Sequence, residues 1–209
     1  MIELVIVGAG GHGRELGSLI AGINAAGPTF RLAGFVDDDP GQSDRLKRLG
    51  LTVLGDVSWL AANPRAFVLG IGTSPTRRAI AARLEGAGCE PVGLVAATAS
   101  VGLDVRLGRG AVVHENATIT TNVTIGAHSH LNVGCAVQHD SIVGQFVQMS
   151  PAVFINGDCV VEDDVFIGTG AIVTRGVRIG AGARIGAGST VLDDVAPNSL
   201  VVGTPARER

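Results

Sequence analysis

The sequence lacks the features that mark several large classes of protein. It has no apolar run of about 18 residues, which a membrane-spanning helix needs, and its start, MIELVIVGAG, has neither the basic region nor the cleavage site of a secretory signal. It also has no basic run, and its formal net charge is -3, so a nucleic acid or an anionic membrane is a poor candidate partner. Its three cysteines form no paired framework. We therefore expect a cytoplasmic protein with free thiols.

The composition changes near residue 96. Before this point, apolar runs alternate with stretches that resemble helices, which is typical of a parallel sheet covered by helices. We expect a small Rossmann-like α/β domain over residues 1–96. Its strands are predicted at residues 2–7, 31–36, 66–70 and 92–95, and its helices end near residue 26 and span residues 75–86.

A six-residue repeat fills most of the remaining chain. Every sixth residue from Val101 to Val191 is aliphatic or methionine, and the residue four places after each is small or β-branched. Each repeat unit then forms one short strand and a turn, and the stacked coils bury the aliphatic ladder. We expect a parallel β-helix over residues 97–195, followed by a C-terminal tail at residues 196–209.

This repeat resembles that of the left-handed β-helix acyltransferases. Together with the GAGGHG segment near the N-terminus and the ending VVGTPAR, it is similar more narrowly to the bacterial sugar acetyltransferases that act on sialic acid or on nucleotide-linked 4-amino sugars. The resemblance spans nearly the whole chain. It implies left-handed coils of three repeats, acetyl-CoA as the acyl donor, no metal, and a nucleotide-linked amino sugar as the acceptor.

The segment LNVGCAVQHDSIVG places His139 next to Asp140. An imidazole suits a base near neutral pH, and an adjacent carboxylate would hold its tautomer. The resemblance implies that this pair is catalytic, although relatives usually have glutamate where Asp140 stands, and that Asn132 has a positioning role. In coils of three repeats Gly157 stacks on His139, and we expect it to leave room for a pantetheine arm.

The resemblance also implies two binding sites. The glycine-rich loop and the following helix N-terminus would hold the phosphates of the nucleotide-linked sugar. Arg77 is either a further phosphate partner or an ordinary solvated arginine at the start of a helix. Gln148 belongs to the segment QMSPAV, which departs from the family pattern. The residues expected to bind acetyl-CoA are Gln148, Gly157, Thr169, Gly186 and Ala187. Those expected to bind the nucleotide sugar are Gly10, Gly11, His12, Asp37, Asp38, Gly72 and Thr73.

The β-helix segment has few charges, and it has no lysine from residue 97 onwards. Its flat faces would be poorly solvated in a single chain. Three β-helices packed side by side bury these faces in the family that the chain resembles. We therefore expect a homotrimer in which His139 faces a neighbouring chain.

Other functions stay open from the sequence. GAGGHG fits the GxGxxG pattern of a dinucleotide site, although the β-helix leaves no residues for a domain that would transfer a hydride. An O-acetyltransferase acting on sialic acid or another sugar hydroxyl is the nearest alternative. A zinc hydratase with three histidine ligands shared between β-helices, and a scaffold without catalytic activity, are the others.

Overall fold

The computed structural model describes residues 1–39, 41 and 43–209. These residues divide into two compact units, Met1–Ala97 and Thr98–Arg209. In the described part of the chain, no helix has the length and hydropathy that a membrane span requires.

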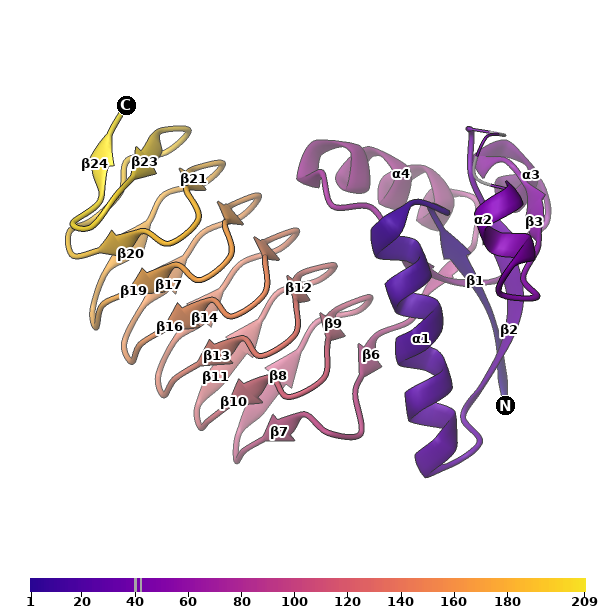
Figure 1. The fold of residues 1–209 in the computed structure, drawn as a ribbon, viewed down its shortest axis with the longest axis horizontal. Coiled ribbons are helices and arrows are strands. Elements are labelled where there is room, and N and C mark those ends of the chain that lie inside the picture. The colour runs from indigo at the N-terminus through magenta and orange to yellow at the C-terminus, as the bar shows by residue number, and fades with distance from the viewer. Residues whose placement is uncertain (40, 42) are drawn as a thin grey trace. The chain divides into compact units, whose positions relative to one another are not determined.

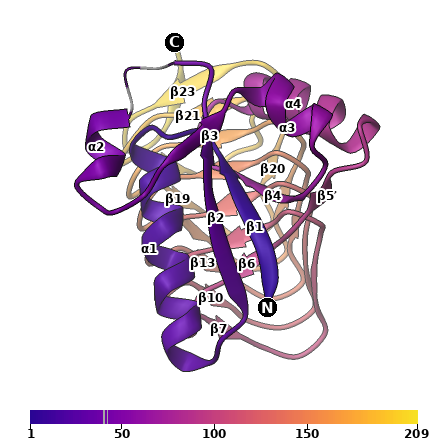
Figure 2. The ribbon, with the colours of Figure 1, turned by 90° about the vertical axis from the view of Figure 1, so that its right-hand side faces the viewer.

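The first unit is a parallel sheet between two layers of helices. Its strands lie in the order β3-β2-β1-β4-β5, and α1 lies on one side of the sheet while α3 and α4 lie on the other (Figure 2). This confirms the Rossmann-like fold. The elements are β1 (Ile2–Val7), α1 (Gly11–Ala26), β2 (Phe30–Val36), α2 (Ser43–Lys47), β3 (Val53–Gly55), α3 (Val57–Ala62), β4 (Ala66–Leu69), α4 (Ser74–Gly86) and β5 (Glu90–Pro91), with β6 (Leu94–Val95) after them.

The centre of this sheet is apolar on both faces. The last four residues of β1, Leu4 to Val7, are all buried, as is typical of a parallel strand covered by helices on both sides. The sequence did not predict β3, β5, α2 or α3, because these elements are two to six residues long and show no clear hydrophobic period. Of the strand expected at residues 92–95, only Leu94–Val95 is observed as a strand, β6.

The second unit is a column of stacked coils (Figure 1) with three sheets along it, whose strands pair in parallel except for the antiparallel pair of β23 and β24. The first sheet contains β7 (Ser100–Val101), β10 (Thr118–Ile119), β13 (Ala136–Val137), β16 (Phe154–Ile155), β19 (Ile172–Val173) and β22 (Thr190–Val191). The second contains β8 (Val105–Leu107), β11 (Val123–Ile125), β14 (Ile142–Val143), β17 (Val160–Val161) and β20 (Arg178–Ile179). The third includes β9 (Val112–Val113), β12 (His130–Leu131), β15 (Gln148–Met149), β18 (Phe166–Ile167), β21 (Arg184–Ile185), β23 (Leu200–Val202) and β24 (Arg207–Glu208).

The ladder that the sequence predicts is the core of this unit. Val137 pairs with Ile155, and Ile155 pairs with Val173, so each coil advances the register by three repeats. Ladder residues in the middle coils have at most 1% of their surface exposed. Only the first coil is open, where Val101 and Leu107 are exposed. The parallel β-helix is therefore confirmed.

Residues 196–209 are not a separate tail. β23 pairs with β21, and Val201 packs against the core below it. Ile185 faces Val201, which is only 16 residues later, so the final coil is two residues shorter than the preceding ones. Because the six-residue period breaks here, periodicity alone could not place this strand.

Cys135 lies in the ladder of small residues and is fully buried. Burial raises the pKa of its thiol to about 11, so the reactive thiolate is scarce at neutral pH. We expect iodoacetamide at neutral pH to leave Cys135 unmodified in the folded protein and to modify it in concentrated urea, as peptide mass spectrometry would show. Rapid modification in the folded protein would contradict this packing.

Candidate active site

His139 and Asp140 lie at the turn that joins β13 to β14, between the first and second sheets. Nδ1 of His139 is 2.8 Å from Oδ2 of Asp140. Asp140 has a φ of 61°, in the left-handed region that aspartate tolerates better than most residues. The shorter carboxylate therefore reaches the imidazole ring from the adjacent position.

Asp140 is also held from the coil before it. Nδ2 of Asn122 donates a hydrogen bond to Oδ1 of Asp140 at 3.0 Å. The hydrogen bond from Asn122, and after it the one from His139, lower the pKa of the Asp140 carboxyl. The carboxylate is thus ionised at neutral pH, as an acceptor for Nδ1–H of His139 requires.

The other nitrogen of His139 is open. Nε2 has no hydrogen-bond partner among the described residues, and 44% of the side chain is exposed. A histidine whose Nδ1 is held by a carboxylate and whose Nε2 is left without a protein partner has the arrangement of a general base.

Gly157 lies one coil above His139. A Cβ at this position would lie 2.4 Å from Cε1 and 2.5 Å from Nε2 of His139. The imidazole ring therefore occupies the space that we expected Gly157 to leave for a pantetheine arm. The glycine allows the ring to lie against the backbone of the next coil.

Two charged residues that the sequence analysis missed complete the corner. Asp158 stacks on Asp140. Arg175 contacts Oδ2 of Asp158 through Nε at 2.7 Å and through Nη2 at 2.6 Å. Ligand atoms of His139, Asp140 and Asp158 lie within 4.8 Å of one another. This group contains a single histidine, and its two carboxylates are already hydrogen-bonded, which does not match a zinc site of three histidines.

Apart from Gly157, the residues expected to bind acetyl-CoA lie elsewhere on the β-helix, and so does Asn132. Asn132, Thr169 and Ala187 occupy turns between the third and first sheets, so the first sheet separates them from His139 within one chain. Oδ1 of Asn132 accepts a hydrogen bond from the backbone of Val133 at 2.7 Å. The structure does not bring these residues to His139 in a single chain.

Gln148 and Gly186 do not offer the open surface expected of them. Gln148 lies on β15 and is buried. A Cβ at Gly186 would lie 2.7 Å from Cγ1 of Val202, because the last coil covers that position. Open backbone occurs instead on the neighbouring turn positions of the same edge, Gly170 and Gly188, where a Cβ would meet nothing within 4 Å.

In the first unit, the expected nucleotide-sugar residues lie on three neighbouring loops. β1 lies between β2 and β4, so the loops after these three strands meet at the carboxyl edge where the strand order reverses. Such an edge is the usual ligand site of an open α/β sheet. The loops carry Gly10, Gly11 and His12 after β1, Asp37 and Asp38 after β2, and Gly72 and Thr73 after β4.

The glycines of GAGGHG have separate structural roles. Gly8 has a φ of 99°, and a Cβ at Gly13 would lie 1.8 Å from the carbonyl oxygen of Gly8, so α1 packs directly against the strand end. A Cβ at Gly10 would meet nothing within 4 Å. The first turn of α1 contains no acidic residue, so the positive end of the helix dipole suits an anion.

Asp37 holds the glycine-rich loop in place. Its Oδ2 accepts a hydrogen bond from the backbone of Ala9 at 2.6 Å, and its Oδ1 accepts one from Asp39 at 2.8 Å. Asp38 similarly accepts from the backbone of Val57 at 3.0 Å, at the start of α3. Both carboxylates fix the loops around the carboxyl edge of the sheet.

The Asp37→Ala variant should loosen this loop. The Ala9 amide loses a charged acceptor, and such hydrogen bonds contribute about 1.5–3 kcal/mol. We expect hydrogen exchange of the Ala9 amide to become about 10- to 100-fold faster, as measured by NMR. An unchanged exchange rate at Ala9 would show that Asp37 does not hold the loop.

The structure also shows the surroundings of His12 and Arg77, which the sequence analysis associated with the nucleotide sugar. Nδ1 of His12 lies 3.4 Å from Oε2 of Glu15, one turn along α1. Arg77 is completely buried, and its Nη1 donates to the carbonyl of Ile71 at 3.0 Å. It therefore supports the loop after β4 from inside and is not an exposed phosphate partner, which corrects the sequence-based expectation.

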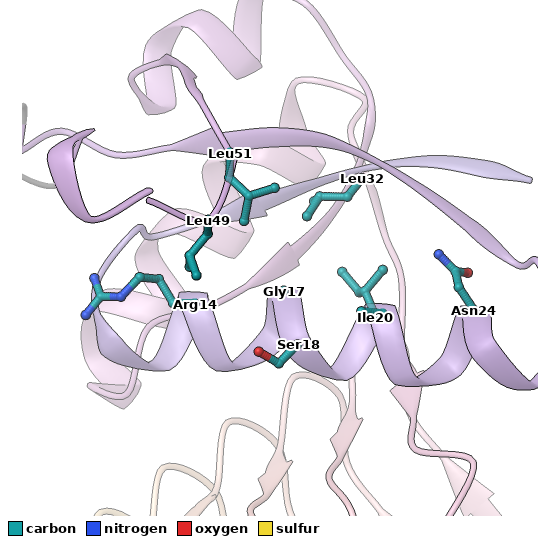
Figure 3. Close-up of a pocket in the computed structure, with 9 residues that line it drawn as sticks. Arg14, Gly17, Ser18, Ile20, Asn24, Leu32, Leu49 and Leu51 are labelled. Carbon is teal, nitrogen blue, oxygen red and sulfur yellow. The ribbon is translucent and has the colours of Figure 1, made fainter. Parts of the chain in front are cut away.

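A cavity of about 330 Å³ lies along α1 in the first unit (Figure 3). It is mainly apolar and includes none of the residues that the sequence analysis assigns to a site. Its lining consists of Arg14, Gly17, Ser18, Ile20, Ala21, Asn24, Leu32, Leu49 and Leu51.

Comparisons with known proteins match both units. Residues 3–84 match the description "PglD N-terminal domain", and residues 158–193 match "Bacterial transferase hexapeptide (six repeats)". GDP-perosamine N-acetyltransferase of Escherichia coli O157:H7 is 34% identical over 214 residues, which cover 97% of this chain and 94% of that protein.

Solved structures agree over the full length. PerB from Caulobacter crescentus, in complex with CoA and GDP-perosamine, has a TM-score of 0.86 at 30% identity and covers 99% of this chain and 97% of that one. The acetyltransferase domain of PglB from Neisseria gonorrhoeae, in complex with acetyl coenzyme A, has a TM-score of 0.88 at 25% identity, covering 99% and 98%. The left-handed β-helix that the family resemblance implied is thereby confirmed. The chain belongs to the family of hexapeptide-repeat sugar acetyltransferases that carry a PglD-type N-terminal domain.

Proposed function

We propose that the protein transfers the acetyl group of acetyl-CoA to the amino group of a nucleotide-linked 4-amino sugar. The observation that carries this proposal is the hydrogen-bonded His139–Asp140 pair, whose imidazole is partly exposed and has no protein partner at Nε2. The 34% identity to a GDP-perosamine N-acetyltransferase over 97% of the chain makes GDP-perosamine the first candidate acceptor.

His139 acts as the general base in this proposal. Its Nε2 accepts the proton that the sugar amine loses as its nitrogen bonds to the acyl carbon, and then returns that proton to the departing sulfur. Asp140 keeps Nδ1 protonated and stabilises the transient imidazolium, while Asn122 holds the carboxylate in place. The reaction thus breaks the thioester C–S bond and forms an amide.

The first unit binds the acceptor in this proposal. Gly10, Gly11 and His12 hold the phosphates at the start of α1, whose first turn contains no acidic residue. Asp37 and Asp38, with the loop at Gly72 and Thr73, form the nucleoside side of the site. The convergence of these loops at one edge of the sheet supports the assignment.

The proposal includes a homotrimer that acts in the cytoplasm. Apolar side chains are exposed on both sheets beside the His139 corner, namely Ile142, Phe154 and Ile172, which are 51%, 43% and 39% exposed. Thr169 and Ala187 lie on one edge of the β-helix, and His139 lies on another. In this proposal, one acetyl-CoA contacts both edges only if two chains contribute one edge each. The free cysteines support a reducing compartment.

Light scattering at micromolar concentration tests the assembly. We expect the mass of three chains, because packing three β-helices together buries the exposed apolar side chains. The Ile142→Glu variant places a charge on this surface and should shift the mass towards one chain. A single-chain mass for the unaltered protein would contradict the trimer.

Thiol release from acetyl-CoA tests the activity. We expect turnover with GDP-perosamine or with a UDP- or dTDP-linked 4-amino sugar, and none with free sialic acid. Turnover with sialic acid alone would instead indicate the O-acetyltransferase. No thiol release with any acceptor would favour another acyl donor or a scaffold.

A further inference from the structure

The corner around His139 contains a second carboxylate and a cation beyond the His139–Asp140 pair. The backbone N–H of Asp158 donates to the carbonyl of His139 at 2.9 Å, which places Asp158 on the next coil beside the ring. Its Oδ2 is contacted by Nε and Nη2 of Arg175 at 2.7 and 2.6 Å. Asp158 and Asp140 thus both lie close to His139, but each has a different partner.

We propose that Asp158 and Arg175 are positioning residues that control the charge around the His139 base. Arg175 holds the Asp158 carboxylate, so that Asp140 alone accepts the hydrogen bond from Nδ1 of His139. It also balances the second negative charge beside the imidazole. This inference rests on the proposed function of His139.

The local charge balance depends on few groups. The strands that flank this corner on the same coil and its two neighbours are β10, β11, β13, β14, β16 and β17, and none carries a titratable residue. The charged groups that face His139 in the described part of the chain are therefore Asp140, Asp158 and Arg175. The same Arg175 charge is among the smaller causes that lower the pKa of Asp140.

Removing Arg175 and removing the charge of Asp158 should shift the protonation of His139 in opposite directions. Without Arg175, two carboxylates face the imidazole and favour its protonated form. Without the Asp158 charge, Arg175 is unbalanced and favours the neutral form. Because these side chains are between 39% and 73% exposed, solvent and salt screen the effect, and we expect shifts of roughly 0.5 pH unit in each direction.

The test measures titration directly and separately from activity. The full-length protein labelled at histidine Cε1 is titrated by NMR, with the His139 signal assigned from the His139→Asn variant, and the pH dependence of kcat/KM is recorded in parallel. We expect Arg175→Gln to move the His139 titration midpoint and the acidic limb of the profile to higher pH. Asp158→Asn should move both to lower pH, and the double variant should return near the unaltered protein.

The chain offers a matched control pair. Nη1 of Arg178 contacts Oε1 of Glu162 at 2.7 Å, away from His139 on the second sheet. The variants Arg178→Gln and Glu162→Gln should leave the His139 midpoint and the profile unchanged. They separate a charge effect at His139 from the general loss of a surface ion pair.

The outcomes also separate the inference from the proposed function. Acetyl transfer with identical His139 midpoints in the Arg175 and Asp158 variants, or with midpoints that move in the same direction, would overturn the positioning role. Opposite shifts in a protein that transfers no acetyl group would support the charge balance and overturn the assignment of His139 as the base. Opposite shifts together with opposite movement of the rate profile would support both.

Discussion

The His139→Asn variant is expected to lose about 10²- to 10⁴-fold in kcat, the contribution typical of a general base. Asparagine cannot accept and return a proton at the position of Nε2, which is the ring nitrogen without a hydrogen-bond partner. KM for the nucleotide sugar should change little, because the proposed sugar-binding residues lie in the first unit. Initial rates of thiol release at saturating acetyl-CoA measure both quantities.

The fold should survive this change. His139 lies at a turn and is 44% exposed, so its replacement leaves the aliphatic core intact. The circular dichroism spectrum and the solution mass of the variant should match those of the unaltered protein. A variant that keeps the full kcat would show that His139 is not the base.

The Gly157→Ala variant should reduce kcat by about 10-fold or more without unfolding the coil, since small displacements of a catalytic group are costly. The added Cβ would lie 2.4 Å from Cε1 of His139, so the ring must move away from its position. Gly157 does not have a φ in the left-handed region, so its backbone accepts alanine without strain. Measuring the thermal unfolding midpoint and kcat on the same variant shows whether kcat falls while the coil stays folded.

A double-mutant cycle shows whether this effect passes through the ring. Gly157→Ala should add nothing to the loss already caused by His139→Asn, because the group that it displaces is then absent. Gly22→Ala is the control variant, since Gly22 belongs to α1 in the first unit and a Cβ there would meet nothing within 4 Å. Additive losses in the double variant would contradict the steric explanation.

The sequence predicted the second unit well because its repeat is strict. A ladder of aliphatic residues at a period of six, with small residues four places later, fits only coils that stack in a constant register. The prediction failed at residues 196–209, where Ile185 pairs with Val201 and the period is interrupted. In the first unit, the longer strands and helices were predicted, while α2, α3 and β3 are too short to show a period.

The candidate site was only partly predictable. Residue type and adjacency identified His139 and Asp140, but the hydrogen bonds of Asn122 and Arg175 were missed. Their positions could have been found, because Asn122 and Asp158 lie one coil below and above Asp140. Thr169 follows His139 by five repeats, and a coil contains three. Five repeats are not a whole number of coils, so Thr169 lies at a different corner of the β-helix. The orientation of the His139 ring over Gly157 required the structure.

The central claim is that this chain forms an amide on a nucleotide-linked amino sugar with His139 as the base. Its most direct test is NMR and mass spectrometry of the product formed from acetyl-CoA and GDP-perosamine. The account predicts one acetamide on the sugar nitrogen, formed by the unaltered protein and far more slowly by His139→Asn. An acetyl ester, or the same amide formed at an equal rate by the variant, would contradict it.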